Sequence, residues 1–223
     1  MRIPNDLFKE IVGYEDLKLL FQTALEQHPS DYPVHFLLVG DVATAKTLFL
    51  LCLSRLRGSA YVLGSRVSRA GLVELLVSRK VKVLLFDEID KVGDKECLTV
   101  LLSLMETGRI VETLHGKMRS VKLDVMVFAT ANDDFDLPEE LLSRFVKLRF
   151  KAYRWGQFYK IAKNILVKRE KIKPKIAKYI AGAVWSKLGS KDFRDCVKLA
   201  RLVRKNQDIR HVRQVVKVMS KYS

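Results

Sequence analysis

Short apolar runs alternate with amphipathic stretches along the first 150 residues of the chain. The apolar runs, which are bounded by charged or turn-forming residues, predict buried strands at 35–40, 60–63, 81–86, 125–129 and 146–150. Helical spacing of apolar residues predicts helices at 14–27, 47–57, 70–78 and 96–107, the first with Leu17, Leu20, Phe21 and Leu25 on one face. Strands and helices in alternation predict an α/β fold, with a parallel sheet covered by helices on both faces.

Two segments depart from this alternation. The β-rich runs 109–114 and 117–123 flank His115-Gly116 and predict a β-hairpin. After Lys151 the pattern is entirely helical, with helices predicted at 155–168, 174–188, 191–204 and 209–220. Pro174 is typical of a first helical turn and Gly189 of a helix end. We therefore expect an α/β domain at 1–150 and a small four-helix domain at 151–223.

The charge distribution supports a boundary near Lys151. The chain carries a net charge of +16, yet residues 1–150 hold 20 Lys and Arg against 21 acids, a net charge of −1. Residues 151–223 hold 21 Lys and Arg against four acids, a net charge of +17. An excess of this size is either a solvated basic face or, as we expect, a surface for an electrostatic partner, which would be a nucleic acid or an acidic protein.

Composition excludes several classes of protein. Hydrophobic residues make up 48% and charged residues 30% of the chain, a balance typical of globular proteins rather than disordered ones. No apolar run is long enough to span a membrane, and the N-terminus carries no apolar signal core, so we expect a cytoplasmic protein. The three cysteines and four histidines lack metal-ligand spacing, which favours buried reduced thiols over a zinc site.

The strongest chemical motif follows the first predicted strand. It reads Gly40-Asp41-Val42-Ala43-Thr44-Ala45-Lys46-Thr47, continues into Leu48, and fits the phosphate-loop pattern GxxxxGK[ST] with Ala45 in place of the second glycine. A tight strand-to-helix turn of this kind aims backbone N–H groups at phosphate oxygens, while Lys46 supplies charge to the β- and γ-phosphates and Thr47 ligates Mg²⁺. Ala43, Ala45 and Asp41 depart from the usual loop, and the plain alternative is an ordinary turn with a chance lysine.

Two later strands also end in polar residues. The predicted strand 81–86 is followed directly by Asp87 and Glu88, where Asp87 can hold Mg²⁺ and Glu88 can polarise an attacking water. The next strand along the chain leads to Asn132, which would lie between the ends of the first two strands and orient that water, or would simply begin a turn. Together with the loop, these residues predict an ATP and Mg²⁺ site at the carboxyl edge of the sheet.

The order of these motifs resembles that of AAA+ ATPases. The phosphate loop, Asp87-Glu88 and Asn132 are followed by Leu141-Leu142-Ser143-Arg144-Phe145 and by Asp192-Phe193-Arg194-Asp195. The resemblance implies a P-loop NTPase fold with a helical lid, ATP hydrolysis, and assembly into a ring, expected to be a hexamer. It further implies that an adenine pocket is lined by Ile11, Val12 and Gly13, and that Asn132 is the sensor-1 residue. It also implies that Arg144 is an arginine finger acting on a neighbouring subunit and that Arg194 is sensor 2.

Within this superfamily, the predicted hairpin is similar to that of minichromosome maintenance helicases and Holliday-junction branch-migration motors. It carries Arg109, Lys117, Arg119 and Lys122, which suit a pore loop that follows a phosphate backbone. We therefore expect a motor that remodels DNA or translocates along it. MoxR-type ATPases, which remodel protein complexes, share much of the pattern and are one alternative. A nucleotide switch that does not hydrolyse ATP is another, given the unusual loop.

Overall fold

The computed structural model describes residues 2–30, 32–42, 44–114 and 117–222. It divides into two compact units, of which the first comprises Met1–Asp41 with Ala45–Phe150 and the second Val42–Thr44 with Lys151–Ser223. The main division falls between Phe150 and Lys151, and the two units are described separately below. No helix in the described ranges combines the length and the apolar character that a bilayer span requires.

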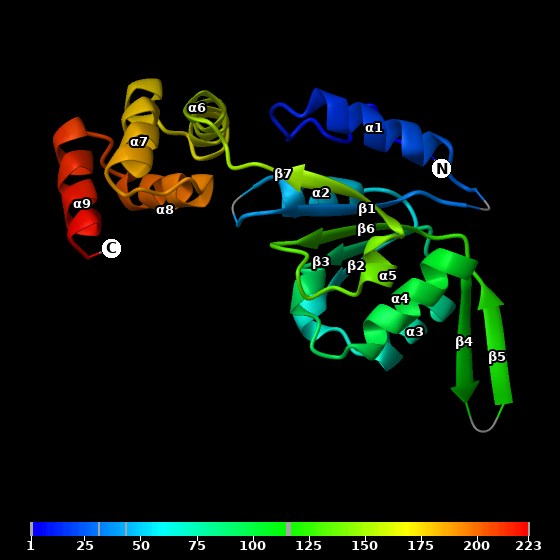
Figure 1. Ribbon diagram of the computed structural model, residues 1–223. Helices are drawn as coiled ribbons and strands as arrows, with labels where there is room; N and C mark the ends of the chain where they lie inside the picture. Colours follow the sequence, from blue (N-terminus) through cyan, green and yellow to red (C-terminus); the bar gives the residue numbers. More distant parts are fainter. Residues whose placement is uncertain (1, 31, 43, 115–116, 223) are drawn as a thin grey trace. The chain divides into compact units, whose positions relative to one another are not determined.

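A five-stranded parallel sheet forms the centre of the first unit (Figure 1). Its strands lie in the order β2-β3-β6-β1-β7. Their bounds are β1 (His35–Gly40), β2 (Ser59–Leu63), β3 (Val83–Asp87), β6 (Met126–Ala131) and β7 (Phe145–Phe150). Because β6 lies between β1 and β3, three strand ends with polar residues are neighbours at one edge of the sheet.

Helices cover both faces of this sheet, as the alternating pattern predicts. They are α1 (Glu15–Glu26), α2 (Lys46–Leu53), α3 (Arg69–Ser78), α4 (Glu96–Thr107) and α5 (Glu139–Leu142), with short 3-10 turns η1 (Gly64–Arg66) and η2 (Ile89–Lys91). On one face the apolar side chains of alternate strand residues form a buried cluster with those of α3 and α4. On the other face Phe21 of α1 and Phe49 of α2 pack their rings 5.3 Å apart, and Phe21 also contacts Phe36 and Phe128 of the central strands.

The predicted hairpin forms a separate two-stranded antiparallel sheet of β4 (Arg109–Leu114) and β5 (Lys117–Lys122) (Figure 1). Arg109 and Lys122 pair across its base. The predicted turn at His115-Gly116 lies outside the described residues, and the side chains of Lys117 and Arg119 are likewise not described.

The second unit is helical, as its sequence predicts. It contains α6 (Trp155–Asn164), α7 (Pro174–Ser186), α8 (Phe193–Val203) and α9 (Ile209–Tyr222), with a π-helical segment η3 (Ile165–Arg169) continuing α6. Buried residues such as Phe158, Ile180 and Leu199 supply its core. Asp192 accepts the N–H of Arg194 and so caps α8.

The structure corrects several predicted boundaries. The helix predicted at 47–57 ends at Leu53, and the turn after it reaches Gly58, whose φ of 85° favours glycine. The helix predicted at 155–168 is α-helical only to Asn164. The strand predicted at 125–129 runs on to Ala131 and therefore includes Thr130, a residue that proves important for the site.

Candidate functional site

Polar residues gather at the carboxyl ends of β1, β6 and β3, where parallel α/β sheets bind their ligands. β1 ends at Gly40 and continues into the phosphate loop, β3 ends at Asp87, and β6 is followed directly by the half-buried Asn132. The order β3-β6-β1 places the β6 end between the other two, as predicted from the sequence.

The phosphate loop connects β1 to α2, and α2 begins at Lys46. Gly40 is required by close packing, because a Cβ at this position would approach the Phe150 carbonyl oxygen to 2.3 Å. Ala45, which replaces the usual second glycine, has a φ of −77°, a value that any L-residue adopts. This departure from the motif therefore costs no backbone strain. Of the other two departures, Asp41 is exposed, and Ala43 lies outside the described residues.

Lys46 is buried and folds back onto the loop. Only 6% of its surface is exposed, and its Nζ donates to the carbonyl oxygens of Gly40 at 2.5 Å and Asp41 at 2.8 Å. Burial lowers the pKa of Lys46, and nearby carboxylates oppose this shift, that of Asp90 most strongly. An ammonium group in this position can contact phosphate oxygens by exchanging its bonds to the loop carbonyls.

Three hydroxyl groups converge on the carboxylate of Asp87, which is 5% exposed. Thr47 Oγ1 donates to Asp87 Oδ1 at 3.2 Å, and Thr130 Oγ1 donates to the same oxygen at 2.5 Å. Tyr61, on the edge strand β2, donates its hydroxyl proton to Asp87 Oδ2. Burial, followed by this bond to Asp87, raises the pKa of Tyr61. The carboxylate is thereby fixed beside Thr47, with which it was predicted to bind Mg²⁺.

The donor set suits Mg²⁺, which prefers oxygen ligands and is usually held by one or two carboxylates together with substrate phosphates. Thr47 and Asp87 supply one hydroxyl and one carboxylate at the end of the phosphate loop. No group of three or more His, Cys, Asp or Glu side chains suited to a metal occurs among the described residues. Mg²⁺ held by these two side chains would take its remaining ligands from phosphate oxygens and water.

Glu88 adopts a left-handed backbone conformation, with a φ of 54° and a ψ of 53°. Such a conformation costs on the order of 1–3 kcal/mol for a residue other than glycine, so the surroundings must impose it. The Glu88 N–H donates to Thr130 Oγ1 at 2.9 Å. On its other side, Gly64 packs so closely that a Cβ there would lie 2.0 Å from the Glu88 carbonyl oxygen. Thr130 thus holds both members of the acidic pair.

The segment predicted to line the adenine pocket packs near the same strand ends. Ile11 is 4% exposed and its carbonyl accepts from Lys18 Nζ at 2.7 Å, while Gly13 has a φ of 80°. The Tyr14 ring lies 5.9 Å from the ring of Phe49 in α2 and 5.3 Å from that of Phe150 in β7. The segment that includes Val12 is therefore anchored beside the helix that begins at the phosphate loop.

The two predicted arginines make contacts elsewhere. Arg144, directly before β7, donates to Glu106 Oε1 at 2.7 Å, and both side chains are about half exposed. Arg194 lies in the second unit, where it pairs with Asp192 at 2.7 Å. Arg144 does not contact the Asp87 cluster within the described part of the chain. A role in catalysis remains a prediction for both arginines.

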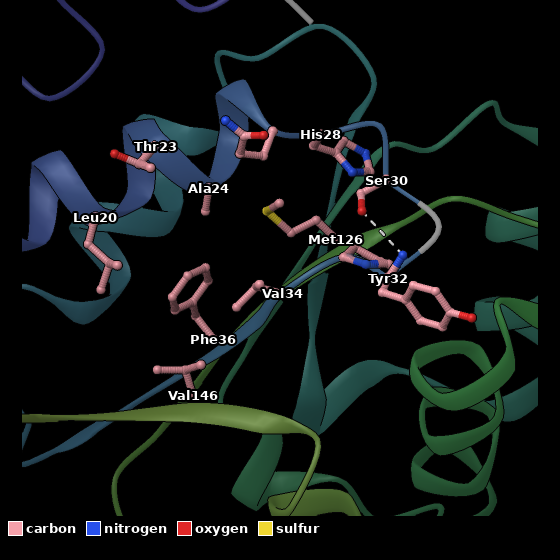
Figure 2. Close-up of a pocket in the computed structure, with 12 residues that line it drawn as sticks. Leu20, Thr23, Ala24, His28, Ser30, Tyr32, Val34, Phe36, Met126 and Val146 are labelled. Carbon is pink, nitrogen blue, oxygen red and sulfur yellow. Dashed lines mark hydrogen bonds between the residues drawn. The ribbon is translucent and has the colours of Figure 1, made fainter.

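A separate concavity of about 270 Å³ lies between α1 and the β1, β6 and β7 strands (Figure 2). Leu20, Val34, Phe36 and Met126 form much of its apolar lining. None of the described residues that line it is a lysine or an arginine.

Comparisons with known proteins agree with this geometry. The family model described as ATPases associated with various cellular activities (AAA) matches residues 37–153. A mutant of Thermotoga maritima RuvB is similar in structure, with a TM-score of 0.72 and 21% identity, covering 96% of this chain and 73% of that chain. The Thermotoga maritima RuvB described as a Holliday junction branch migration motor gives a TM-score of 0.70 and 22% identity, covering 93% and 70%.

A closed-state reconstruction of Hsp104 with ATPγS and FITC casein is also similar, with a TM-score of 0.67 and 19% identity. The alignment covers 90% of this chain and 45% of the Hsp104 chain. No curated protein matches the chain in sequence. At these identities the structural likeness shows the fold, whereas the family model covers more than half of the chain, including the loop, the acidic pair and Asn132. The chain therefore belongs to the AAA family of ATPases and is an ATP hydrolase.

Proposed function

We propose that the chain is the motor part of an oligomeric ATPase that uses ATP and Mg²⁺ to remodel DNA or translocate along it. The observation that carries the ATPase mechanism is the convergence of Thr47, Tyr61 and Thr130 on Asp87 beside the phosphate loop. This convergence holds the Asp87 carboxylate in a fixed position next to Thr47 of the phosphate loop.

The proposal assigns a role to each residue of the site. Lys46 would contact the β- and γ-phosphates, and Thr47 and Asp87 would hold Mg²⁺. Bound Mg²⁺ neutralises charge that develops on the transferred phosphoryl group. Glu88 accepts a proton from the attacking water, and Asn132 orients that water. The loop residues from Gly40 to Leu48 supply backbone N–H groups, and Ile11, Val12 and Gly13 contact the adenine.

The neighbouring subunit completes the site. Phosphoryl transfer spreads negative charge over the γ-phosphate oxygens, and an additional cation stabilises it. Arg144 supplies that cation to the adjacent site, and Arg194 from the helical domain contributes a second. Assembly into a ring, expected to be a hexamer, therefore controls turnover.

DNA is the proposed substrate because of the charge distribution and the hairpin. The second unit carries an excess of 17 positive charges, and the hairpin pairs Arg109 with Lys122 at its base. Lys117 and Arg119 add two cations to the same hairpin in sequence. The similarity to RuvB, described as a branch migration motor, favours the same class of substrate. Remodelling of a protein complex is the second candidate, favoured by the similarity to Hsp104, whose structure contains casein.

An ATPase assay across protein concentrations tests the proposal. Lys46→Ala is expected to abolish nucleotide binding, whereas Glu88→Gln is expected to retain binding and lose turnover by about 10²-fold or more. Lys80→Ala and Glu74→Gln, at exposed positions on and after α3, are the matched controls. Full turnover by either site variant would overturn the mechanism.

The substrate is tested in the same assay. Stimulation of turnover by DNA, lost as the salt concentration rises, supports the DNA proposal. Stimulation by a protein substrate such as casein, with no response to DNA, would replace it with protein remodelling.

A further inference from the structure

The last helix, α9, presents four cations on one face. Arg210, Arg213, Lys217 and Lys221 are all exposed and follow one another at intervals of three, four and four residues. Residues three and four apart lie on the same side of a helix. Val212 and Val216, on an adjacent face of the helix, are buried against the rest of the unit. We call these four cations the α9 stripe.

The carboxylates of this unit are engaged elsewhere. Arg169 and Arg201 pair with Glu170, Arg194 with Asp192, and Lys198 with Asp195. Asp208 accepts the N–H groups of Arg210 and His211 and so begins α9. None of the carboxylates in the described part of this unit forms an ion pair with the side chains of the α9 stripe. Its charge is therefore available to a partner, unlike that of the cations on α8.

Aromatic rings lie beside the same cations. Arg213 lies 5.9 Å from the ring centroid of Tyr179 on α7, and Lys187 lies 5.8 Å from the same ring. Tyr222, at the end of α9, is 78% exposed, with Lys221 Nζ 5.2 Å from its ring centroid. Tyr179 is only partly exposed, so Tyr222 is the ring open to stacking. An exposed ring beside cations is a combination with which proteins bind single-stranded nucleic acids, because bases stack on the ring while cations contact phosphates.

The spacing of the stripe fits a phosphate backbone. At a rise of about 1.5 Å per residue, the four cations extend over about 16 Å of helix. Each strand of B-form DNA presents one phosphate per about 3.4 Å of its axis, so this length offers about five phosphates to the four cations. An acidic protein segment would need a comparable run of carboxylates and would make no use of the rings.

We propose that the α9 stripe binds the phosphodiester backbone of a nucleic acid, with preference for a single strand (α9 is the red helix in Figure 1). The binding is independent of base sequence, because the stripe offers charge rather than base-edge contacts. This inference rests on the proposed action on DNA, and it assigns part of the binding to the helical domain in addition to the hairpin.

The test compares two variants of the full chain that carry the same net charge. One replaces Arg210, Arg213, Lys217 and Lys221 by Gln, and the control replaces four exposed lysines of the same unit, Lys160, Lys163, Lys168 and Lys175, by Gln. Binding of a fluorescent single-stranded oligonucleotide, a duplex of the same sequence, and poly-glutamate is measured by anisotropy at several salt concentrations. Circular dichroism and basal ATPase activity verify that each variant is folded.

The stripe variant is expected to bind the single strand at least about 100-fold more weakly at 50 mM salt. The slope of the logarithm of its association constant against the logarithm of the salt concentration should be less negative by about 3. The control variant is expected to show a much smaller loss of affinity and a much smaller change in salt dependence. If the wild type binds DNA and the stripe variant binds it as well as the control does, the stripe assignment is wrong and the DNA proposal stands. If the wild type binds no DNA, both fail. Tighter stripe-dependent binding of poly-glutamate would identify an acidic protein as the partner and overturn the inference.

Discussion

Thr130 provides a sharp test of how the nucleotide site is held together, because its hydroxyl serves both acids. It donates to Asp87 Oδ1 at 2.5 Å, accepts the Glu88 N–H at 2.9 Å, and is 1% exposed. Valine has nearly the same shape and lacks the hydroxyl. A hydrogen bond to a charged group contributes about 1.5–3 kcal/mol, and an unsatisfied buried N–H costs about 1–3 kcal/mol. We expect Thr130→Val to lower the free energy of unfolding by about 2.5–6 kcal/mol, the sum of the two effects.

The effect on turnover should exceed the effect on binding. Without Thr130, Glu88 loses the bond that supports its left-handed conformation, and a displacement of about 1 Å in a catalytic group can cost about 10²-fold in rate. Lys46 and the phosphate loop are untouched, so the Kd for nucleotide should change by less than about threefold. We would measure kcat by phosphate release and Kd with a fluorescent nucleotide, at a temperature at which all variants are folded.

Thr130→Ser is the matched control, because serine retains the hydroxyl and loses only a methyl group. It should keep kcat within a few-fold of the wild type. Equal kcat values for the valine and serine variants would refute the reasoning. A parallel loss of nucleotide binding in Thr130→Val would show instead that the substitution disrupts the whole site.

Two further predictions concern residues outside the cluster. Glu106→Gln removes the carboxylate that pairs with Arg144. Because an exposed ion pair contributes about 0.2–1 kcal/mol, ATPase activity at concentrations that favour assembly should rise by up to about fivefold. The control Glu140→Gln should leave the activity unchanged, and a decrease in Glu106→Gln would contradict the prediction. His35 accepts the Val127 N–H through Nδ1 at 3.1 Å, and burial lowers its pKa to about 4. Below about pH 6.5, the ordinary pKa of histidine, His35 is protonated in the unfolded chain but remains neutral in the folded one. The free energy of unfolding should therefore fall as the pH is lowered, by about 2 kcal/mol between pH 7 and 5. Urea unfolding at both pH values should show a smaller loss for His35→Asn than for the wild type, and an equal loss would exclude His35 as the cause.

The elements of the fold could be predicted because their apolar runs are short and sharply bounded. β1 and α4 have the predicted limits, and the parallel sheet follows from the alternation. Boundaries failed where tertiary packing, rather than local pattern, decides. The extension of β6 to Ala131 depends on its pairing with β1, because Thr130 and Ala131 align with Leu38 and Val39. A single sequence does not show this pairing.

The candidate site was predictable only in part, for a related reason. Lys46, Thr47 and Asp87 belong to motifs whose spacing along the chain reflects the chemistry they perform. Tyr61 and Thr130 belong to no such motif, and they meet at Asp87 because β2 and β6 flank β3 in the sheet. Strand order would have indicated both, since each carries a hydroxyl near the carboxyl end of a strand that pairs with β3. The pairing of Arg144 with Glu106 had no sequence signal.

Acidic side chains surround Lys46, and their charge bears on the proposal that a neighbouring subunit completes the site. Four carboxylates, those of Asp90, Asp87, Asp41 and Glu88, act on this single ammonium group and oppose the lowering of its pKa by burial. A triphosphate entering this site adds negative charge to a region where acids already outnumber the lysine. In the proposed mechanism, Mg²⁺ and a cation from a neighbouring subunit would supply additional positive charge to this acidic site. The acidic surroundings of Lys46 thus favour a site that a second subunit completes, and they do so independently of the resemblance that first suggested Arg144.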